Sequence, residues 1–175
     1  MIDPGEVLEV LEDLIVAQES SLLSGITKNG VQRTFKHVDS TYHGAPRDYY
    51  YIGINEINSR DTWAQSGGSI NAVPSVRTEY DIEIEVVDYA LMQHGEEYPY
   101  KVMNRHFSLL YSRIATLIET SDTAPFVGAS GNKFRLMDDW RRRTIRATQQ
   151  SGYEQSSNGY QALLRCVLAF TLISC

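Results

Sequence analysis

The residues best placed to do chemistry are four acids that alternate along one segment, Glu79, Asp81, Glu83 and Glu85. Alternate side chains of a strand share one face, so this spacing predicts a row of carboxylates on one side of a strand. Paired carboxylates on a strand can hold Mg²⁺ in nucleases. Such a site normally adds a nearby Lys, and Lys101 is the only Lys in the next forty or so residues. We therefore favour a solvated face of an amphipathic strand over a metal site, although four repelling acids in one row indicate that their sign serves a purpose.

A basic segment near the C-terminus is the counterpart of the acidic row. Its six positive side chains outnumber Asp138 and Asp139, and Trp140 lies among them, a combination that suits contact with a nucleic-acid backbone. The alternative is an interface strand that pairs with acids of a neighbouring subunit, since Arg is favoured in interface ion pairs. The whole chain is acidic, with a formal charge of −6, so we favour the protein–protein interface. The six residues are Lys133, Arg135, Arg141, Arg142, Arg143 and Arg146.

Tyrosine is the unusual residue of the composition, with 11 copies, and three are consecutive at Tyr49, Tyr50 and Tyr51. Tyr is enriched at interfaces because it buries a large area and keeps a polar tip. Strands also favour aromatic residues, which explains part of the signal. The tyrosines, with Tyr49 and Tyr51 on the same face, add to the prediction of an interaction surface.

Signatures of catalysis are missing from the sequence. The four histidines do not stand in metal-ligand spacing, and no nucleophile elbow, phosphate-binding loop or dinucleotide fingerprint occurs. We expect His106 to lie on the surface of a helix and Cys166 to be a buried, inert thiol. The sequence therefore predicts a protein that is not an enzyme and has no metal site or cofactor. The histidines are His37, His43, His94 and His106.

Composition bounds the class of protein. The 175 residues, 42% of them hydrophobic and 22% charged, match ordinary globular usage and predict one domain over 1–175. Cys166 and Cys175 are too few for a disulfide framework. The first residues carry no basic and apolar regions of a secretory signal, and no apolar run has the roughly 18 residues of a membrane span. We therefore expect an intracellular, soluble type of protein without membrane contact.

Hydrophobic periodicity predicts the elements that carry these residues. A helix begins with Asp3 as N-cap, Pro4 at the first position and Glu6 completing a capping box. Strands are expected at 31–38, 49–57 and 76–89, with a long polar loop or hairpin arm at about 58–74. A second helix at 98–120 precedes a strand at 134–148, bent near 138–139, a polar turn at 151–159 and a strand at 160–173. The order α-β-β-β-α-β-β predicts an α+β domain with a mostly antiparallel sheet and two flanking helices.

The apolar stripes of these elements predict the core. Twelve side chains are expected to be buried: Leu8, Leu11, Ile15, Ile82, Ile84, Val86, Phe107, Leu110, Ile114, Leu164, Leu168 and Phe170.

This order of elements, closed by the tyrosine-led apolar strand Gly159-Tyr160-Gln161-Ala162-Leu163-Leu164-Arg165-Cys166-Val167-Leu168-Ala169-Phe170, resembles the tail terminator (tail-completion) proteins of long-tailed bacteriophages. The resemblance covers most of the chain and includes no catalytic motif. It implies a structural virion protein at the junction of tail and neck, assembled in the host cytoplasm. It also implies a homo-oligomeric ring, expected to be a hexamer, that caps the tail tube protein and docks to the neck connector.

The resemblance gives the charged segments expected roles. Glu79, Asp81, Glu83 and Glu85 would line an acidic lumen through which DNA passes without specific binding. The basic and tyrosine residues would form the subunit interface, with the acidic first helix of the neighbour as their candidate partner: Arg141, Arg142, Arg143, Arg146, Tyr49 and Tyr51.

Three alternatives remain open at this level. One is another neck or head–tail joining protein, although a connector would be mainly helical and a head-closure ring mainly β-barrel. The second, of a different class, is a Mg²⁺-dependent DNA-processing enzyme that uses the acidic strand. The third is a generic adaptor or chaperone domain, which would stay monomeric or dimeric.

Overall fold

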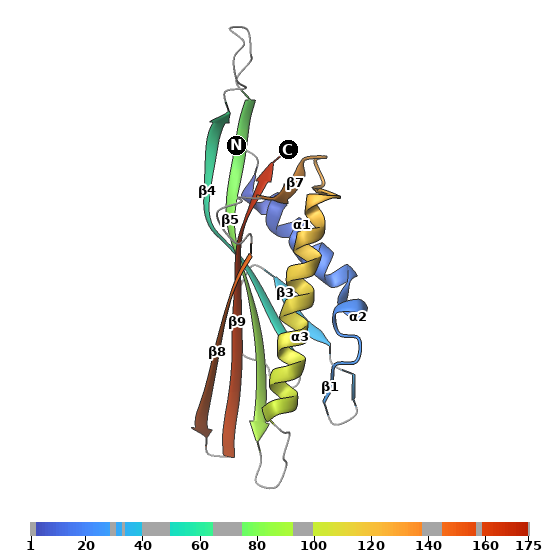
Figure 1. The fold of residues 1–175 in the computed structure, drawn as a ribbon, viewed down its shortest axis with the longest axis vertical. Coiled ribbons are helices and arrows are strands. Elements are labelled where there is room, and N and C mark those ends of the chain that lie inside the picture. Colours follow the sequence, from blue (N-terminus) through green and yellow to red (C-terminus); the bar gives the residue numbers. More distant parts are fainter. Residues whose placement is uncertain are drawn as a thin grey trace.

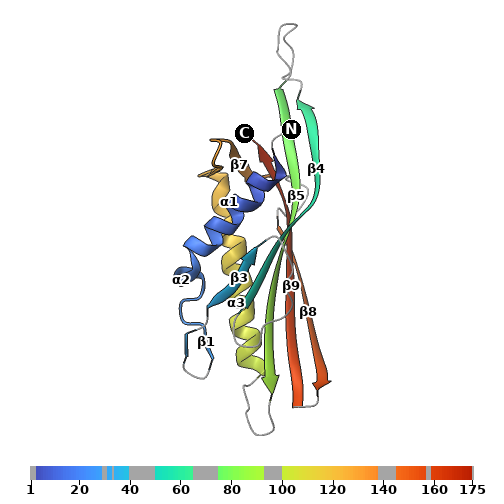
Figure 2. The same ribbon diagram turned by 180° about the vertical axis from the view of Figure 1, so that it is seen from behind.

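The chain folds as a single α+β domain in which helices cover one face of a long, mostly antiparallel sheet (Figure 1). The structure is a computed structural model, and it describes residues 3–28, 31–32, 34–39, 50–64, 75–92, 100–137, 145–156 and 159–174. Seen from behind, the helices again lie on one side of the sheet and no described helix lies on the other (Figure 2). The predicted fold class is therefore confirmed.

The helices are α1 (Pro4–Ala17), the short α2 (Glu19–Leu22) and α3 (Tyr100–Glu119), which continues into the 3-10 turn η1 (Thr120–Asp122). The sheet has seven strands: β3 (Phe35–Asp39), β4 (Tyr50–Ala64), β5 (Ser75–Met92), β9 (Gly159–Ser174), β7 (Lys133–Leu136), β6 (Phe126–Val127) and β8 (Ile145–Ser156). β3 runs parallel to β4, and every other pairing is antiparallel. A separate small hairpin pairs β1 (Thr27–Lys28) with β2 (Val31–Gln32).

Helix α1 begins where the sequence predicts. The Gly5 N–H donates to Asp3 Oδ1 at 2.9 Å, and Pro4 occupies the first turn. The second half of the predicted capping box is wrong, because the Glu6 carboxylate turns away from Asp3. It accepts hydrogen bonds from Ser130 N–H and from Asn132 Nδ2 in the turn between β6 and β7. Hydrogen-bond donors that are distant in the sequence thus replace the backbone N–H of Asp3 as partners of the Glu6 carboxylate.

The core lies between the helices and the face of β4, β5 and β9 that they cover. Eleven of the twelve predicted core side chains are buried, and Leu8 is half-buried on the edge of the α1 stripe. Each fully buried large apolar side chain contributes roughly 1.5–3 kcal/mol of transfer free energy. Tyr80 and Phe134 contact edge to face within this core, with ring centroids 6.0 Å apart.

The polar segment predicted as a loop or hairpin arm at 58–74 is a hairpin arm over its described part. β4 continues to Ala64, and residues 58–64 all pair with β5, whereas residues 65–74 lie outside the described residues. The predicted 151–159 turn is wrong over its first part, because β8 pairs with β9 as far as Ser156. Both segments are polar because one face of the sheet is uncovered, and cross-strand pairing overrides their low hydrophobicity.

Candidate functional site on the polar face of the sheet

The face of the sheet opposite the helices is built from polar side chains of four strands, and we call it the polar face. Directly opposed residues of antiparallel strands share a face, so the register assigns its members. The Glu83 row illustrates this, since Glu83 opposes Asn55 of β4 and Ala169 of β9, which in turn opposes Arg146 of β8. By the same register the face includes Asn58, Arg60, Thr62, Arg77, Glu79, Asp81, Glu85, Thr148, Gln150, Arg165, Val167 and Thr171.

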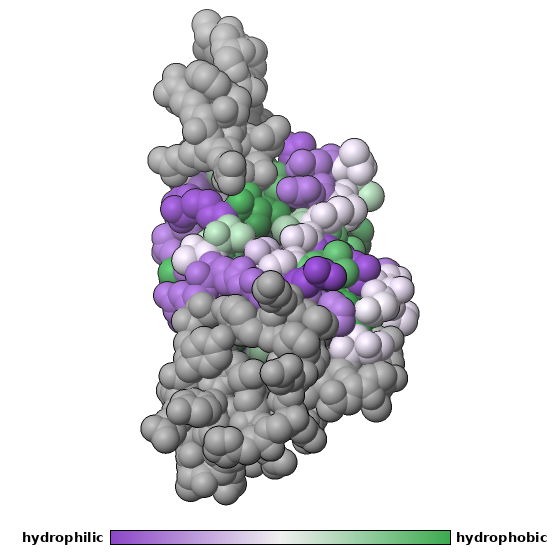
Figure 3. Space-filling view, turned by 60° about the horizontal axis from the view of Figure 1, so that its bottom comes forward, coloured by the Kyte–Doolittle hydropathy of each residue, from purple (hydrophilic) through white to green (hydrophobic). Residues whose placement is uncertain are grey.

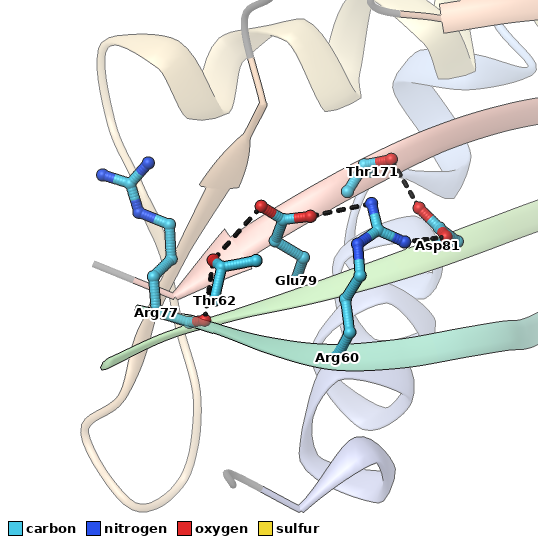
Figure 4. Close-up of polar contacts among 6 residues, drawn as sticks. All are labelled: Arg60, Thr62, Arg77, Glu79, Asp81 and Thr171. Atoms are coloured by element: carbon cyan, nitrogen blue, oxygen red, sulfur yellow. Dashed lines mark hydrogen bonds and ion pairs between the residues drawn. The ribbon is translucent and has the colours of Figure 1, made fainter. Parts of the chain in front are cut away.

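A single arginine, Arg60, forms ion pairs with the first two acids of the predicted row, Glu79 and Asp81 (Figure 4). Arg60 Nη2 lies 2.7 Å from Glu79 Oε2, and Arg60 Nη1 lies 2.6 Å from Asp81 Oδ2. Thr171 Oγ1 donates to the other Asp81 oxygen at 2.7 Å, and Thr62 Oγ1 lies 3.3 Å from Glu79 Oε1. We call these five residues the Arg60 clamp. It ties β4, β5 and β9 together on the uncovered side of the sheet.

The contacts of the Arg60 clamp shift the pKa values of Asp81 and Arg60. Burial raises the pKa of Asp81, but the hydrogen bonds from Thr171 and Arg60 outweigh it and leave that pKa below its ordinary value. The hydrogen bond to Asp81 raises the pKa of Arg60. Both shifts favour the charged forms, so the clamp is an ion pair at neutral pH.

A second arginine, Arg165, forms an ion pair with Glu85, the last acid of the row. Arg165 Nε of β9 lies 2.6 Å from Glu85 Oε1, whose side chain is 16% exposed. Glu83 lies between the two ion-paired regions, and the structure shows no hydrogen bond or ion pair from it to any described residue. Three of the four acids are therefore partnered.

The interpretation of the row as a solvated face is therefore wrong in part. Glu79 is only 8% exposed, although no described helix covers this side of the sheet. Arginine side chains from the flanking strands lie against the acids, and the sequence could not reveal this because it does not specify register. The register places the four acids of β5 on the same face as five arginines, Arg60, Arg77, Arg135, Arg146 and Arg165.

The predicted interface residues are only partly described. Arg146 is exposed on β8, on the polar face. Tyr51 occupies β4 opposite Val87, and nothing further of its side chain is described. Tyr49 and Arg141, Arg142 and Arg143 lie outside the described residues, as do His43 and His94.

Cys166 and His106 are the remaining chemical candidates whose side chains the structure describes. Cys166 is fully buried on the helix side, and burial raises the pKa of its thiol to about 11, as expected of an inert cysteine. His106 is half-buried on α3 with a buried Nδ1, so its predicted place on the helix surface is correct only in part. No group of three or more His, Cys, Asp or Glu residues that could hold a metal occurs in the described part of the chain. None of the described helices is long and apolar enough to cross a membrane.

Arg60, Arg165 and Glu6 are not among the site residues that the sequence predicts. Arg60 lies within the segment predicted as a polar loop or hairpin arm, and hydrophobic alternation does not specify its pairing with the acidic strand. Glu6 is buried where α1 meets the turn between β6 and β7, and a Cβ on Gly128 would collide with its carboxylate. Glu6 and the glycine-containing turn that it contacts are far apart along the chain, so the sequence alone does not predict this contact.

Hydrophilic residues dominate the described surface in Figure 3, with small hydrophobic areas between them. The exposed large hydrophobic side chains among the described residues are dispersed over α1, β4, α3 and β6: Val16, Ile57, Leu109 and Val127. In comparisons with known proteins, the sequence matches no family model and no curated protein.

Proposed function

We propose that this chain is a structural subunit of a bacteriophage tail, a tail terminator whose copies form a ring that caps the tail tube and joins it to the neck. The observation that carries the proposal is the two-sided sheet, with helices packed on one face and an ion-paired polar face left uncovered by every described element. A ring subunit needs this division, because one face supplies the core while the other meets solvent or DNA.

The polar face suits the wall of a channel. Glu79, Asp81 and Glu85 are tied to arginines of the same chain, so those arginines are not free to bind phosphates. Glu83 is the acid that adds negative charge locally. We therefore place these four acids in the lumen of the ring.

The same contacts disfavour the enzymatic alternative. A Mg²⁺ site on this strand would need the carboxylate oxygens that Arg60 and Thr171 occupy. Binding a cation there would require breaking the Arg60 clamp. The geometry supports a structural role for the acidic row more than a metal-dependent one.

The subunit interface is proposed to include the basic and tyrosine residues Arg141, Arg142, Arg143, Arg146, Tyr49 and Tyr51. Their candidate partner is the acidic α1 of the neighbouring copy, on which Glu9 and Asp13 are exposed. A closed ring requires such a heterologous contact between two different surfaces of each copy. Reversing Arg141, Arg142 and Arg143 to Glu is expected to yield monomers, and rings that survive this change would contradict the assignment.

The deciding experiment combines the purified protein with tail tubes that lack a terminator. We expect light scattering to show rings, alone or on addition of tubes, and negative-stain images to show one cap at one tube end. Glu83→Gln serves as the matched control for later lumen variants, because it removes a charge without breaking an observed ion pair. A protein that remains monomeric and ignores tubes would refute the proposal, and Mg²⁺-dependent cleavage of DNA would support the enzymatic alternative.

A further inference from the structure

Three cations of the polar face take no part in the ion pairs described above. Lys133 and Arg135 are the two exposed, alternate residues of β7. Arg135 opposes Ile173 of β9, which opposes Glu79 of β5, so Arg135 lies on the polar face. Lys133 lies two residues before it on β7 and therefore faces the same way. Arg77 has the same relation to Glu79 on β5. We call Arg77, Lys133 and Arg135 the cationic end.

The three side chains gather at one end of the sheet. Figures 1 and 2 show β7 and the C-terminal end of β9 in the same half of the molecule as the paired ends of β4 and β5. Two strand spacings and two residues separate Arg77 from Arg135, so their backbones are about 12 Å apart, whereas those of Lys133 and Arg135 are about 7 Å apart. The backbone positions thus spread the three charges over this end of the face.

The charges of the cationic end are not neutralised within the described part of the chain. Glu79 is the nearest acid in the register, but Arg60 and Thr62 contact its two carboxylate oxygens. Figure 4 shows the Arg77 guanidinium directed away from Glu79. No ion pair among the described residues involves the charged groups of the cationic end. These groups are therefore available to an anion from outside the chain.

Charge is distributed unevenly along the polar face. The rows through residues 77–81 of β5 carry two acids, both held by Arg60, and the three further cations of the cationic end. In the rows through residues 83–87, the acids Glu83 and Glu85 accompany the cations Arg146 and Arg165. One end of the face therefore has an excess of positive charge that the next rows lack.

We propose that the cationic end binds the phosphate backbone of double-stranded DNA without regard to sequence. The proposal rests on the proposed luminal position of the polar face, and it assigns a further function to one end of that face. In a ring the three cations recur in every copy, so their contacts surround the duplex at one mouth of the channel. The backbone is held there by charge, whereas the rows around Glu83 let it pass.

The layout of the charges favours DNA over an acidic protein as the anion. A duplex carries a phosphate about every 3.4 Å along each strand, so it offers anions to cations that are about 7–12 Å apart. A protein partner would need an apolar or aromatic anchor beside the charges. Among the described residues of β6 and β7, Val127, opposite Lys133, is the one exposed large hydrophobic side chain. Phosphate contacts carry no sequence information, which suits a channel that DNA of any sequence must cross.

The salt dependence of DNA binding tests the cationic end. Fluorescence anisotropy is measured with the purified full chain and a labelled duplex in EDTA, between about 50 and 200 mM NaCl. Each phosphate contact contributes about 0.9 to the slope of log affinity against log salt concentration, so three contacts weaken binding roughly 40-fold over this range. The combined variant Arg77→Gln, Lys133→Gln and Arg135→Gln should lose that dependence for each copy that contacts the duplex.

Matched single variants separate the effect of charge from that of structure. Arg135→Gln should reduce the salt slope by about 1. Arg105→Gln removes an arginine that is also exposed, but on α3 at the other side of the sheet, and should leave the slope unchanged. Arg135→Lys should stay close to wild type, because it keeps the positive charge. Thermal melts monitored by circular dichroism should agree for all three variants, since each changed side chain is exposed.

Several outcomes would overturn the DNA contact. These are an unchanged slope in the combined variant, equal losses in Arg105→Gln and Arg135→Gln, or a wild-type chain that leaves the duplex unbound at about 50 mM NaCl. Binding of poly-L-glutamate that depends on the three cations, with DNA binding that does not, would assign the surface to an acidic protein instead.

The tube-capping assay tests the ring separately. A chain that caps tubes, while its combined variant binds DNA like wild type, would refute only the DNA contact. A chain that binds DNA through the cationic end but ignores tail tubes would refute the proposed function.

Discussion

The Arg60 clamp makes the sharpest prediction about stability. Arg60→Ala removes the partner of two carboxylates, of which Glu79 is 8% exposed. A charge-assisted hydrogen bond contributes about 1.5–3 kcal/mol and an exposed ion pair at most about 1 kcal/mol. The Arg60 side chain is 44% exposed, so solvent screens its two contacts, and we discount them accordingly. We expect a loss of about 2 kcal/mol in the free energy of unfolding, measured by urea denaturation at pH 7.

The cost of Arg60→Ala in the free energy of unfolding should depend on pH through the ionisation of Asp81. The folded pKa of Asp81 lies below its ordinary value, so its contribution to stability is fully present above the unfolded pKa of about 3.8. It is lost as the pH falls through the lower, folded pKa. The difference in unfolding free energy between wild type and Arg60→Ala should therefore shrink below pH 4.

Arg77→Ala is the matched control for this experiment. Arg77 lies on the same face of β5, and its guanidinium points away from the clamp in Figure 4. Its loss should cost less than about 0.5 kcal/mol, as expected for a surface residue. A double-mutant cycle of Arg60→Ala with Asp81→Asn should give a coupling energy of about 1–2 kcal/mol. Equal costs for the two alanine variants, or a coupling energy near zero, would refute the clamp.

Four further predictions concern separate parts of the molecule. Glu6→Gln should lower the urea midpoint of unfolding at pH 7; hydrogen bonds from Asn132 and Ser130 lower the pKa of Glu6, so the difference from wild type should fade below pH 4.5. Gly128→Ala should destabilise by about 2 kcal/mol and by much less in a Glu6→Ala background, and additive costs would contradict the close contact. In a Cys175→Ser background, Cys166 should react with a thiol reagent at pH 8 only after unfolding, because it is fully buried with a pKa of about 11. Finally, Glu83→Lys should reduce DNA passage through assembled particles relative to Glu83→Gln, and unchanged infectivity would count against a luminal position.

Local patterns in the sequence determined much of the fold. Asp3 and Pro4 specify the start of α1, because capping depends only on residues within one turn. The alternation of Tyr80, Ile82 and Ile84 with acids specifies a strand with one buried face, and the structure confirms it. These signals are short-range, so they can be read without knowing which elements meet.

Tertiary structure decided the rest. Polar segments such as Asn58–Ala64 and Ser151–Ser156 are strands only because β5 and β9 supply their hydrogen-bond partners. The carboxylate row is visible in the sequence, but its pairing with Arg60 and Arg165 depends on a register that hydrophobic alternation does not specify. The same holds for Glu6, whose donors lie more than 120 residues away along the chain. The sequence by itself therefore determined which residues carry charge and which faces are apolar, whereas the fold decided which charges meet, because contacts between strands and helices distant in the chain exist only once the sheet has formed.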